Sequence, residues 1–544
     1  MNRRSERDDV DDGLPVVRRL PERFDTANLF SRFSRLPGCV WFDSATASLD
    51  QSPADSPLDR YSFLAAAPVA WLRLNLQIAP PASASDPPGD LPSGQPLQGH
   101  LDWSQLQHWV DQLPAGNLQH DDGIRLPPFQ GGIATIIGYE AGASLEPVGV
   151  SPHDDLPTSA LTAGLYDVVI ATDHHTNQNW LFSQGFLDGT ATRSREQAVC
   201  RADQFQRWLE TDDHDLAQKI ANASPVQQIV CEASVSKSAD RPGVDRSPRR
   251  QPTSGASGSP VYSASKNGID LTSNFDRQGF MTSVAQIVDR ICRGDSFQVN
   301  LAQRLTSPAV CDSPRLYEKL RQANPATFAG YFDAGDFQVL SSSPEGFLQV
   351  RDRLVSTRPI KGTRPRGRST DEDQTIGNAL RHSEKDRAEN IMIVDLMRND
   401  LSRVCQDDSV VVDTLCGLEK YQYVQHLVSV VRGRLKPSHG LVDLIRCCFP
   451  GGSVTGAPKI EAMRTIAELE PHRRGPYCGS MGYISSQIDA DFNILIRTVT
   501  ATAGTWLLPV GGGMTARSDP AAEWDETWSK AEGMLQAFRN LDAT

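Results

Sequence analysis

The feature that most limits how this chain can fold is a polar, low-complexity tract between residues 222 and 268. It includes the run SADRPGVDRSPRRQPTSGASGSP, in which serine, proline and arginine predominate. Such a composition offers too little apolar surface to offset the entropy that a chain loses on ordering. We therefore predict a mobile linker between two folded stretches, residues 20–215 and 273–539. The arginines of the tract could bind an acidic partner, but a solvated insert is the simpler interpretation.

The composition of the whole chain bounds the kind of partner it can have. With 544 residues, 39% of them hydrophobic and 22% charged, the chain can bury a large core or form two or three domains. Its formal net charge of −13 argues against nucleic acid or an anionic membrane as the main partner, because both attract basic surfaces. A small molecule or another protein is the expected partner.

The cysteines and the N-terminal segment indicate the compartment. Ten cysteines are spread along the chain without a C-x-x-C pair or zinc-like spacing, so they predict neither a disulfide framework nor a metal centre. The segment MNRRSERDDVDDGLPVVRRLPERF alternates charges and lacks the apolar core of a signal peptide, and no 18 apolar residues run together. We expect a cytoplasmic protein with reduced thiols and no membrane segment.

The first folded stretch has mainly the patterns of strands. LRLNLQI (72–78) alternates strictly, and GGIATIIGY (131–139) and residues 167–182 are also typical of sheet, the last as a hairpin that turns at His174–Asn179. Residues 195–210 have the composition of a helix. We predict a mostly β region with one late helix.

The second stretch alternates between helix and strand. It begins with SNFDRQGFMTSVAQIVDRICRG, where apolar residues recur at helical spacing and Gly294 stops the helix. Strands such as FQVLSSS and ILIRTVTAT then alternate with helices near 384–403, 457–469 and 521–539. This pattern predicts a mixed α/β (α+β) domain.

Two glycine-rich segments resemble nucleotide-binding loops but lack the required features. In GGSVTGAPK (451–459) Ala-Pro separates Gly456 from Lys459, and no Ser or Thr follows the lysine of the expected phosphate loop. GGGMTA (511–516) is followed by ARSDP rather than by a helix, which argues against a dinucleotide site. Glycine-rich turns still expose backbone N–H groups, which suit carboxylate binding.

Two pairs of acidic residues indicate a site for a hard cation. Asp386 and Glu389 lie three residues apart on a predicted helix face that also carries apolar residues, so they point inward. Glu523 and Glu526 repeat this spacing just after the second glycine-rich segment. Mg²⁺ takes a few carboxylates, keeps several waters and is completed by substrate oxygens. The alternative for either pair is ordinary charge on a helix surface.

At this point the motifs identify a family. GDSFQVNLAQR, SSSPEGF, RPIKGTR, DLMRNDLSRVC, FPGGSVTGAPKIEAM, RRGPYCGSMGYI and GGGMTARSDPAAEWDET closely resemble segments of the chorismate-utilising enzymes, and in particular their aminodeoxychorismate synthase component I branch. The resemblance covers essentially all of residues 273–539 and extends more weakly to CVWFDSA and RYSFLAAAP. It implies the anthranilate synthase component I fold, in which two antiparallel sheets form a sandwich with surrounding helices.

The lysine of RPIKGTR decides between branches of this family. Enzymes that make anthranilate have PIAGT, with alanine at the position of Lys361, whereas a lysine marks the aminodeoxychorismate branch. The mechanism that the resemblance implies begins with attack of Lys361 on carbon 2 of chorismate, which expels the hydroxyl of carbon 4. Ammonia then adds at carbon 4 and expels the lysine. A lysine attacks only when neutral, and Mg²⁺, Arg358 and Arg364 are expected to lower its pKa.

The resemblance also implies roles for other residues around the substrate ring. Glu345 would be the acid/base, and Thr363 and Thr455 would bind the substrate. His426 would lie beside the ring, unless it is a buried structural histidine. Mg²⁺ would be held against the ring carboxylate by Glu389 and Glu526, with Asp386 and Glu523 in support. The family usually has Glu where Asp386 stands.

A further set of residues is expected at the second carboxylate of the substrate. The resemblance places Tyr477, Arg497 and the backbone of Gly511, Gly512 and Gly513 at the enolpyruvyl carboxylate, where a fixed guanidinium can bind in a bidentate manner. Lys530 would support a carboxylate, although a surface lysine fits its helix nearly as well.

The expected partners follow from what the sequence lacks. No G-x-C-x-G segment of a glutamine amidotransferase surrounds any cysteine, so the nitrogen is expected from ammonia or from a separate glutamine amidotransferase subunit. The first domain of this family often holds tryptophan. Here WFDS (41–44) and NPATF (324–328) replace the LLES and NPSPY of feedback-inhibited relatives, so inhibition is not expected, whereas a structural tryptophan remains open.

The function that these observations predict is the conversion of chorismate and ammonia to 4-amino-4-deoxychorismate, the first step of p-aminobenzoate and folate synthesis. One alternative is an anthranilate synthase component I, which Lys361 disfavours. The other is a non-catalytic ligand-binding or regulatory subunit, which would not need Lys361, Glu345 and both acidic pairs together.

Overall fold

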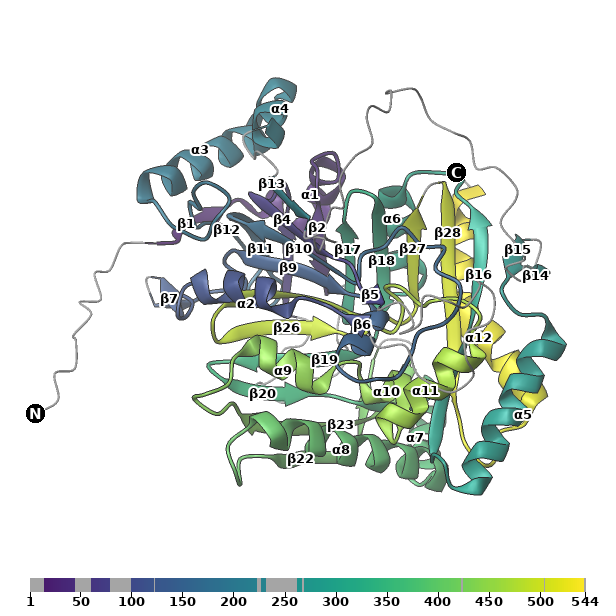
Figure 1. Cartoon of the computed structure of the whole chain (residues 1–544). Helices are drawn as coiled ribbons and strands as arrows, with labels where there is room; N and C mark the ends of the chain where they lie inside the picture. Colours follow the sequence, from purple (N-terminus) through teal and green to yellow (C-terminus); the bar gives the residue numbers. More distant parts are fainter. Residues whose placement is uncertain are drawn as a thin grey trace, which may run out of the picture.

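The computed structural model describes residues 14–44, 60–78, 99–121, 123–222, 227–230, 262–266, 269–421, 424–502 and 504–542. Within these ranges the chain has a mixed α/β fold with two large sheets and surrounding helices (Figure 1). The fold class predicted from the sequence is therefore confirmed.

The larger sheet has 13 strands among the described residues. In spatial order they are β1 (Val16–Leu20), β12 (Gln178–Ser183), β11 (Val168–Asp173), β3 (Tyr61–Ala65), β2 (Val40–Asp43), β17 (Phe328–Asp333), β18 (Phe337–Ser343), β27 (Thr498–Thr502), β28 (Thr505–Met514), β16 (Gln298–Pro308), β15 (Ile269–Ser273) and β14 (Tyr262–Lys266), with β24 (Gly456–Ala457) paired to β16. The predicted hairpin at His174–Asn179 is present as β11 and β12.

The smaller sheet has 11 strands in the same described ranges. Their order is β13 (Gln227–Val230), β4 (Ala70–Leu74), β10 (Leu161–Tyr166), β9 (Gly132–Ile137), β25 (Ser480–Ser486), β26 (Asp489–Asn493), β19 (Gly346–Arg351), β20 (Leu354–Thr357), β23 (Val424–Arg434) and β21 (Ile360–Pro365), with β22 (Val411–Lys420) paired to β23. The pairs are antiparallel except for β13 with β4. Two small ribbons, β5 (Gln77–Ile78) with β6 (Gly99–His100) and β7 (His120–Asp121) with β8 (Ile124–Arg125), complete the strands.

Both large sheets run through the two stretches that the sequence suggested as separate domains. In the larger sheet β2 pairs with β17, so that Trp41 lies opposite Tyr331. In the smaller sheet β9 pairs with β25. Figure 1 shows the purple and blue strands of the first stretch beside the green and yellow strands of the second. The tract at 222–268 therefore divides the sequence but not the sheets.

The ends of that tract also differ from the prediction of a linker. Residues 227–230 form β13 on β4, and residues 262–266 form β14 on β15. The interior of the tract, residues 231–261, lies outside the described part of the chain. Local polarity missed β13 because its partner, β4, is far away in the sequence. It missed β14, which pairs with the next strand of the chain, because a polar composition alone predicts no strand.

The helices agree with the sequence pattern in the second stretch more than in the first. They are α1 (Thr26–Phe33), α2 (Trp103–Gln112), α3 (Arg195–Thr211), α4 (His214–Asn222), α5 (Arg277–Arg293), α6 (Ser313–Ala323), α7 (Thr370–Arg381), α8 (Glu384–Val404), α9 (Leu441–Cys448), α10 (Gly452–Thr455), α11 (Lys459–Leu469) and α12 (Pro520–Asp542), with short 3-10 turns η1 (Glu22–Phe24) and η2 (Tyr139–Ser144). Gly294 caps α5 with φ 93°, as predicted.

The prediction of a single helix in the first stretch was wrong. Both α1 and α2 are short, and each begins after an aspartate, Asp25 or Asp102, whose carboxylate accepts a backbone N–H of the first turn. These two N-cap aspartates are the sequence signal that could have predicted the helices.

Neither a membrane span nor a disulfide is found among the described residues. No described helix is long and apolar enough to cross a bilayer. The nine cysteines in the described ranges are all free. The cytoplasmic location expected from the sequence stays a prediction.

Candidate active site

A cavity of about 710 Å³ opens where both sheets meet α8 and α12. Its walls come from β21 and β23 of the smaller sheet, β16 and β28 of the larger sheet, α8, α12, the short helix α10 with Ser453, and the segment around Arg474. The residues that the sequence predicted for the site all line this cavity except Thr455: they are Glu345, Lys361, Thr363, Asp386, Glu389, His426, Tyr477, Arg497, Gly511, Gly512, Gly513, Glu523, Glu526 and Lys530.

Thr455 does not line this cavity. It is fully buried at the end of α10, and its hydroxyl donates to the carbonyl oxygen of Gly451 at 3.1 Å. The hydroxyl thus satisfies the backbone of its own helical turn. Its contact with substrate stays a prediction.

Lys361 lies in β21 at a bulge that Gly362 makes possible. The register of β21 against β23 shifts between Lys361 and Thr363, and Gly362 there has φ 77°, a conformation that favours glycine. A Cβ on Gly362 would also lie 2.9 Å from the Cβ of Asp386. The Lys361 Nζ donates to the carbonyl oxygen of Ser453 at 3.2 Å. The bulge thus directs the amine into the cavity.

Burial is what favours the neutral form of this amine. It lowers the pKa of Lys361, although the carboxylates of Glu345 and Glu389 act in the opposite direction. The expected contribution of two arginines is not observed. Arg358 pairs with Glu419 at 2.5 Å, and Arg364 pairs with Asp386 at 3.0 Å.

Because each guanidinium has its own acid partner, neither acts on the lysine as a free positive charge. The cation that does lower the pKa of Lys361 is Lys530.

Glu345 is a buried acid whose charge acts on Lys361. Its side chain is 5% exposed, and burial raises its pKa, against a hydrogen bond from Ser453 and the charge of Lys361. Its backbone is fixed on both sides, since its N–H donates to the Ser343 hydroxyl and its carbonyl accepts from the N–H of Ile494 at 3.0 Å. A carboxyl group with a raised pKa beside an amine with a lowered pKa is suited to proton transfer near neutral pH.

His426 and Thr363 face each other across β21 and β23. The two residues are register partners, and the Thr363 Oγ1 lies 2.9 Å from the His426 Nδ1. Burial, helped by the charge of Arg497, lowers the pKa of His426 to about 4. The ring is therefore neutral at pH 7, which suits a hydrogen-bonding role rather than a cationic one.

The two acidic pairs project from α8 and α12 into the same cavity. One oxygen of Glu389 is buried without a hydrogen-bond partner among the described residues, and the Lys385 ammonium is 3.9 Å away. Burial raises the pKa of Glu389, and the Glu526 charge adds to this rise. This oxygen fits a cation ligand, because a buried carboxylate oxygen without a hydrogen bond is costly.

The other three acids of these pairs already have partners. Asp386 accepts from Arg364 at 3.0 Å, Glu523 accepts from the Ser518 hydroxyl at 2.6 Å, and Glu526 pairs with Lys530 at 2.8 Å. No three Asp, Glu, His or Cys side chains in the described ranges form a group that could hold a metal by themselves. A Mg²⁺ ion at this position would therefore need ligands from water and substrate, which is its usual preference.

The second glycine-rich segment is a strand rather than the expected turn. Gly511 and Gly513 lie within β28, opposite Ala302 and Asn300 of β16. The Gly511 carbonyl accepts from the Lys530 Nζ at 2.9 Å, so the polar groups of Gly511 point away from β16.

In an antiparallel pair, residues two apart point their polar groups to the same edge, so Gly513 does the same. The N–H groups of Gly511 and Gly513 therefore point from the edge of β28 into the cavity, where an anion could accept hydrogen bonds from them.

Arg497 and Tyr477 supply further polar groups on the cavity wall. Arg497 adopts φ 50°, a rare conformation for a side-chain-bearing residue, and burial lowers the pKa of its guanidinium. No carboxylate among the described residues pairs with it. Tyr477 is 6% exposed. An unpaired guanidinium beside free backbone N–H groups is suited to a carboxylate ligand.

Three polar residues of the site received no role from the sequence. The Ser453 carbonyl accepts from both Lys361 and Asn300, and Arg474 donates to the carbonyl of Val454. Asn300 and Arg474 stand in GDSFQVNLAQR and RRGPYCGS, segments that indicated the family without assigning individual functions. Their roles depend on contacts between distant loops, which no local pattern shows.

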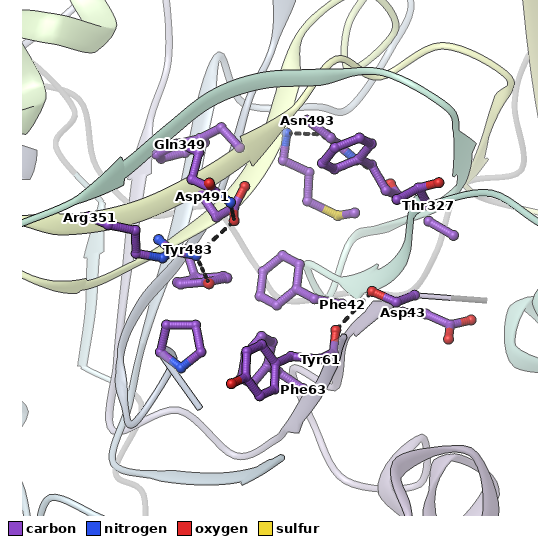
Figure 2. A pocket seen from close by; sticks show the side chains of 16 residues that line it. Phe42, Asp43, Tyr61, Phe63, Thr327, Gln349, Arg351, Tyr483, Asp491 and Asn493 are labelled. Atoms are coloured by element: carbon purple, nitrogen blue, oxygen red, sulfur yellow. Dashed lines mark hydrogen bonds and ion pairs between the residues drawn. The ribbon is translucent and has the colours of Figure 1, made fainter. Parts of the chain in front are cut away.

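A second, smaller cavity of about 100 Å³ lies between the sheets and is lined by the segments expected to hold tryptophan (Figure 2). Phe42, Tyr61, Phe63 and Tyr483 form its aromatic side, and Asp43 and Asp491 its acidic side. The Asp43 carboxylate is already bound by Arg321 at 2.7 Å. Tryptophan in this cavity stays a prediction.

Comparison with known proteins identifies the family of the chain. The family model for chorismate binding enzymes matches residues 84–536, and the chain belongs to that family. It is an enzyme of the aminodeoxychorismate or anthranilate synthase type.

Three relatives illustrate the match. The chain is 34% identical to aminodeoxychorismate synthase component 1 of Salmonella typhimurium over 527 residues, 97% of this chain and 99% of the relative. It is 33% identical to anthranilate synthase component 1 of Streptomyces coelicolor over 526 residues, 95% of this chain and 88% of the relative. The crystal structure of anthranilate synthase component I from Streptococcus pneumoniae superposes with a TM-score of 0.66 at 27% identity, covering 90% of this chain and 94% of that one.

Proposed function

We propose that this enzyme converts chorismate and ammonia to 4-amino-4-deoxychorismate and water through a covalent bond to Lys361. The observation that carries the proposal is the position of the Lys361 amine: it lies in the large cavity, its pKa is lowered by burial, and a buried acid of raised pKa, Glu345, interacts with it. The resemblance of RPIKGTR to the aminodeoxychorismate branch, whose lysine replaces the alanine of anthranilate-forming enzymes, supports this reaction over the other.

The reaction consists of two balanced allylic displacements. In the first, the lone pair of the Lys361 Nζ forms a bond to carbon 2, both conjugated double bonds of the ring shift by one position, and the bond from carbon 4 to its hydroxyl breaks. The hydroxyl leaves as water after it takes a proton. In the second, ammonia forms a bond to carbon 4, both double bonds shift back, and the bond from carbon 2 to Lys361 breaks. The lysine is regenerated, and nitrogen has replaced oxygen at carbon 4.

Glu345 supplies and recovers the proton in this scheme. Because burial raises its pKa, a protonated form is accessible to donate to the departing hydroxyl. The carboxylate that remains can accept a proton from the incoming ammonia. Ser343 and Ile494 hold the backbone of Glu345, so the carboxyl group is pre-positioned.

The two carboxylates of chorismate would be bound at opposite ends of the cavity. Arg497, Tyr477 and the N–H groups of Gly511 and Gly513 would take the enolpyruvyl carboxylate. Glu389 and Glu526 would hold Mg²⁺, with Asp386 and Glu523 in support. When bound, the ion would neutralise the ring carboxylate, whose charge otherwise disfavours a position between acidic side chains. Thr363 and His426 would bind the ring face.

Ammonia would come from a separate glutamine amidotransferase subunit. The relatives are named component 1, which implies a second component, and no glutaminase nucleophile segment occurs in this sequence. Tryptophan in the smaller cavity would serve structure rather than feedback inhibition.

The deciding experiment is to incubate the purified chain with chorismate, Mg²⁺ and ammonia and to separate the products by chromatography. We expect 4-amino-4-deoxychorismate. Anthranilate as the main product would favour the second candidate, anthranilate synthase, for which the similarity to the Streptomyces relative is the specific support. Absence of any turnover would favour a non-catalytic subunit.

A further inference from the structure

One edge of β16 has a gap in its strand pairing. Along this edge β24 pairs only with Gln298 and Val299, and β15 pairs only with Leu305 and Thr306. The residues between them, including Asn300 and Ala302, lie opposite Gly513 and Gly511 on the other edge. Since Gly511 and Gly513 point their polar groups away from β16, Asn300 and Ala302 point theirs away from β28, into the gap.

A buried ion pair takes the place of the missing strand. The Ala302 N–H donates to the Glu470 Oε1 at 2.8 Å, and the Asn300 carbonyl accepts from the Arg474 guanidinium at 3.2 Å. Glu470 and Arg474 are joined by two bonds of 2.7 and 2.8 Å, and each side chain is 3% exposed. The pair therefore supplies one acceptor and one donor to β16, as a neighbouring strand would.

Arg474 itself is held from several sides. Its guanidinium lies over the Tyr139 ring at 4.4 Å, and its backbone N–H donates to the Glu140 carboxylate at 2.7 Å. Both residues belong to η2, which comes from the first stretch of the chain. Residues that do not line the cavity of Lys361 therefore hold the Arg474 guanidinium in place.

The same guanidinium also binds α10, the short helix whose Ser453 carbonyl accepts from Lys361. It donates to the Val454 carbonyl at 3.0 Å, one peptide away from the Ser453 carbonyl. Ser453 accepts from the side chain of Asn300 at 3.1 Å and from Lys361 at 3.2 Å. Arg474 therefore holds the backbone carbonyls of both Asn300 and Val454. The Ser453 carbonyl is fixed between them, because Asn300 donates to it and Val454 is the next residue of the chain.

We propose that the Arg474–Glu470 ion pair is a positioning element for Lys361, acting through Asn300 and the Ser453 carbonyl oxygen. The pair holds this carbonyl at the distance at which the amine is oriented into the cavity. Arg474 and Glu470 are positioning residues and exchange no proton with substrate. The effect on turnover rests on the function proposed above, but the orientation of Lys361 does not.

The test measures the reactivity of the Lys361 amine itself. The purified full chain is treated with cyanate, which carbamoylates neutral amines, and modification of Lys361 is compared with that of Lys385, whose side chain is 60% exposed, by peptide mass spectrometry. The Ser453 carbonyl favours the ammonium form over the neutral amine. Displacing it in Arg474→Lys, which keeps the positive charge, should therefore raise the Lys361-to-Lys385 ratio about threefold at pH 8.

A second variant and a control keep the result interpretable. Asn300→Ala carries no charge change and is expected to raise the ratio similarly, so it serves if Arg474→Lys does not fold. Asp167→Asn breaks another buried ion pair, with Arg201 at 2.8 Å, neither residue of which lines the cavity, and should leave the ratio unchanged despite lost stability. A ratio within about 1.5-fold of wild type in folded Arg474→Lys and Asn300→Ala overturns the inference.

Turnover then separates this inference from the proposed function. If both hold, Arg474→Lys lowers kcat about tenfold with little change in the chorismate KM, because orientation rather than binding is lost. If wild type makes no 4-amino-4-deoxychorismate while the labelling ratio still shifts, the proposed function fails and the positioning role stands.

Discussion

The Lys361 Nζ and the Ser453 carbonyl oxygen are 3.2 Å apart, a hydrogen bond that joins β21 to α10. When the amine is neutral, it makes this bond through an N–H, so its lone pair stays available for attack. The flat, permanently charged guanidinium of an arginine could keep this contact but not the nucleophilicity.

Replacement of Lys361 by arginine therefore separates a covalent role from an electrostatic one. We expect Lys361→Arg to be as inactive as Lys361→Ala in forming 4-amino-4-deoxychorismate. Lys361→Ala recreates the PIAGT sequence and should yield at most traces of an anthranilate-type product. With chorismate and Mg²⁺ but no ammonia, intact-protein mass spectrometry should find a substrate-sized adduct on wild type and on neither variant. Retention of about a tenth of the wild-type rate by Lys361→Arg would refute the covalent role.

The direction in which Glu345 shifts the pKa of Lys361 can be measured. The Glu345 carboxylate raises the pKa of Lys361 against the larger lowering by burial, so its removal should lower that pKa further. The pH midpoint for carbamoylation of Lys361 should lie below 10.5 in wild type and at still lower pH in Glu345→Gln. Glu468→Gln, a substitution at a side chain 58% exposed on α11, should leave the midpoint in place. A midpoint that moves upward in Glu345→Gln would contradict the assigned interaction.

Glu389 and Glu526 should set the requirement for Mg²⁺. Each of Glu389→Gln and Glu526→Gln is expected to lower ammonia-dependent turnover at least about a hundredfold and to weaken Mg²⁺ binding by calorimetry, while the unfolding midpoint stays near that of wild type. Glu468→Gln is again the matched control. Undiminished turnover of wild type in EDTA would exclude the ion from the reaction.

Glutamine should support turnover only with a partner. The purified chain is expected to use ammonia at high pH but not glutamine, and an amidotransferase subunit should restore glutamine-dependent product. The reason is the missing glutaminase nucleophile segment. Glutamine-dependent product from the single chain would show the prediction to be wrong.

Acid should destabilise the fold partly through His472. Burial and the charge of Arg304 lower the pKa of His472 to about 4, while the Asp155 carboxylate opposes them and His153 adds to them. The unfolded chain, with an ordinary histidine pKa near 6.5, therefore binds the proton more readily than the folded one. The stabilising contribution is complete above pH 6.5 and is lost as the pH falls toward 4.

The free energy of unfolding in urea should thus fall less steeply between pH 6.5 and 4 for His472→Gln than for wild type. His108→Gln, on the exposed side of α2, should follow wild type. Parallel curves for wild type and His472→Gln would contradict the prediction.

The sequence was informative wherever a local rule determines the structure. Gly294 ends α5 because a left-handed cap suits glycine, and the spacing of Asp386 with Glu389 and of Glu523 with Glu526 places each pair on one helix face. The motifs of the family then brought these acids together with Lys361 and Glu345. All of these residues line one cavity in the structure.

The remaining features depend on partners that are distant in the sequence. Nothing near Arg364 shows that it will pair with Asp386, and nothing in GGGMTA shows that β16 will pair with it and make it a strand. The Thr455 hydroxyl bonds to the backbone of its own helical turn, a contact that local motif position could not show. The same limitation hid β13, whose partner β4 is distant in the sequence.

Because β2 pairs with β17 and β9 pairs with β25, each half of the chain covers strand edges of the other half in both sheets. A proteolytic cut within residues 231–261 would leave two fragments, each with open strand edges in both sheets. Such fragments should remain bound to each other as a nicked enzyme, and either one expressed alone should aggregate through those edges. The residues that line the active site come from the second half of the chain. The sheets that hold these residues are nevertheless completed by strands of the first half, so an intact site requires both halves.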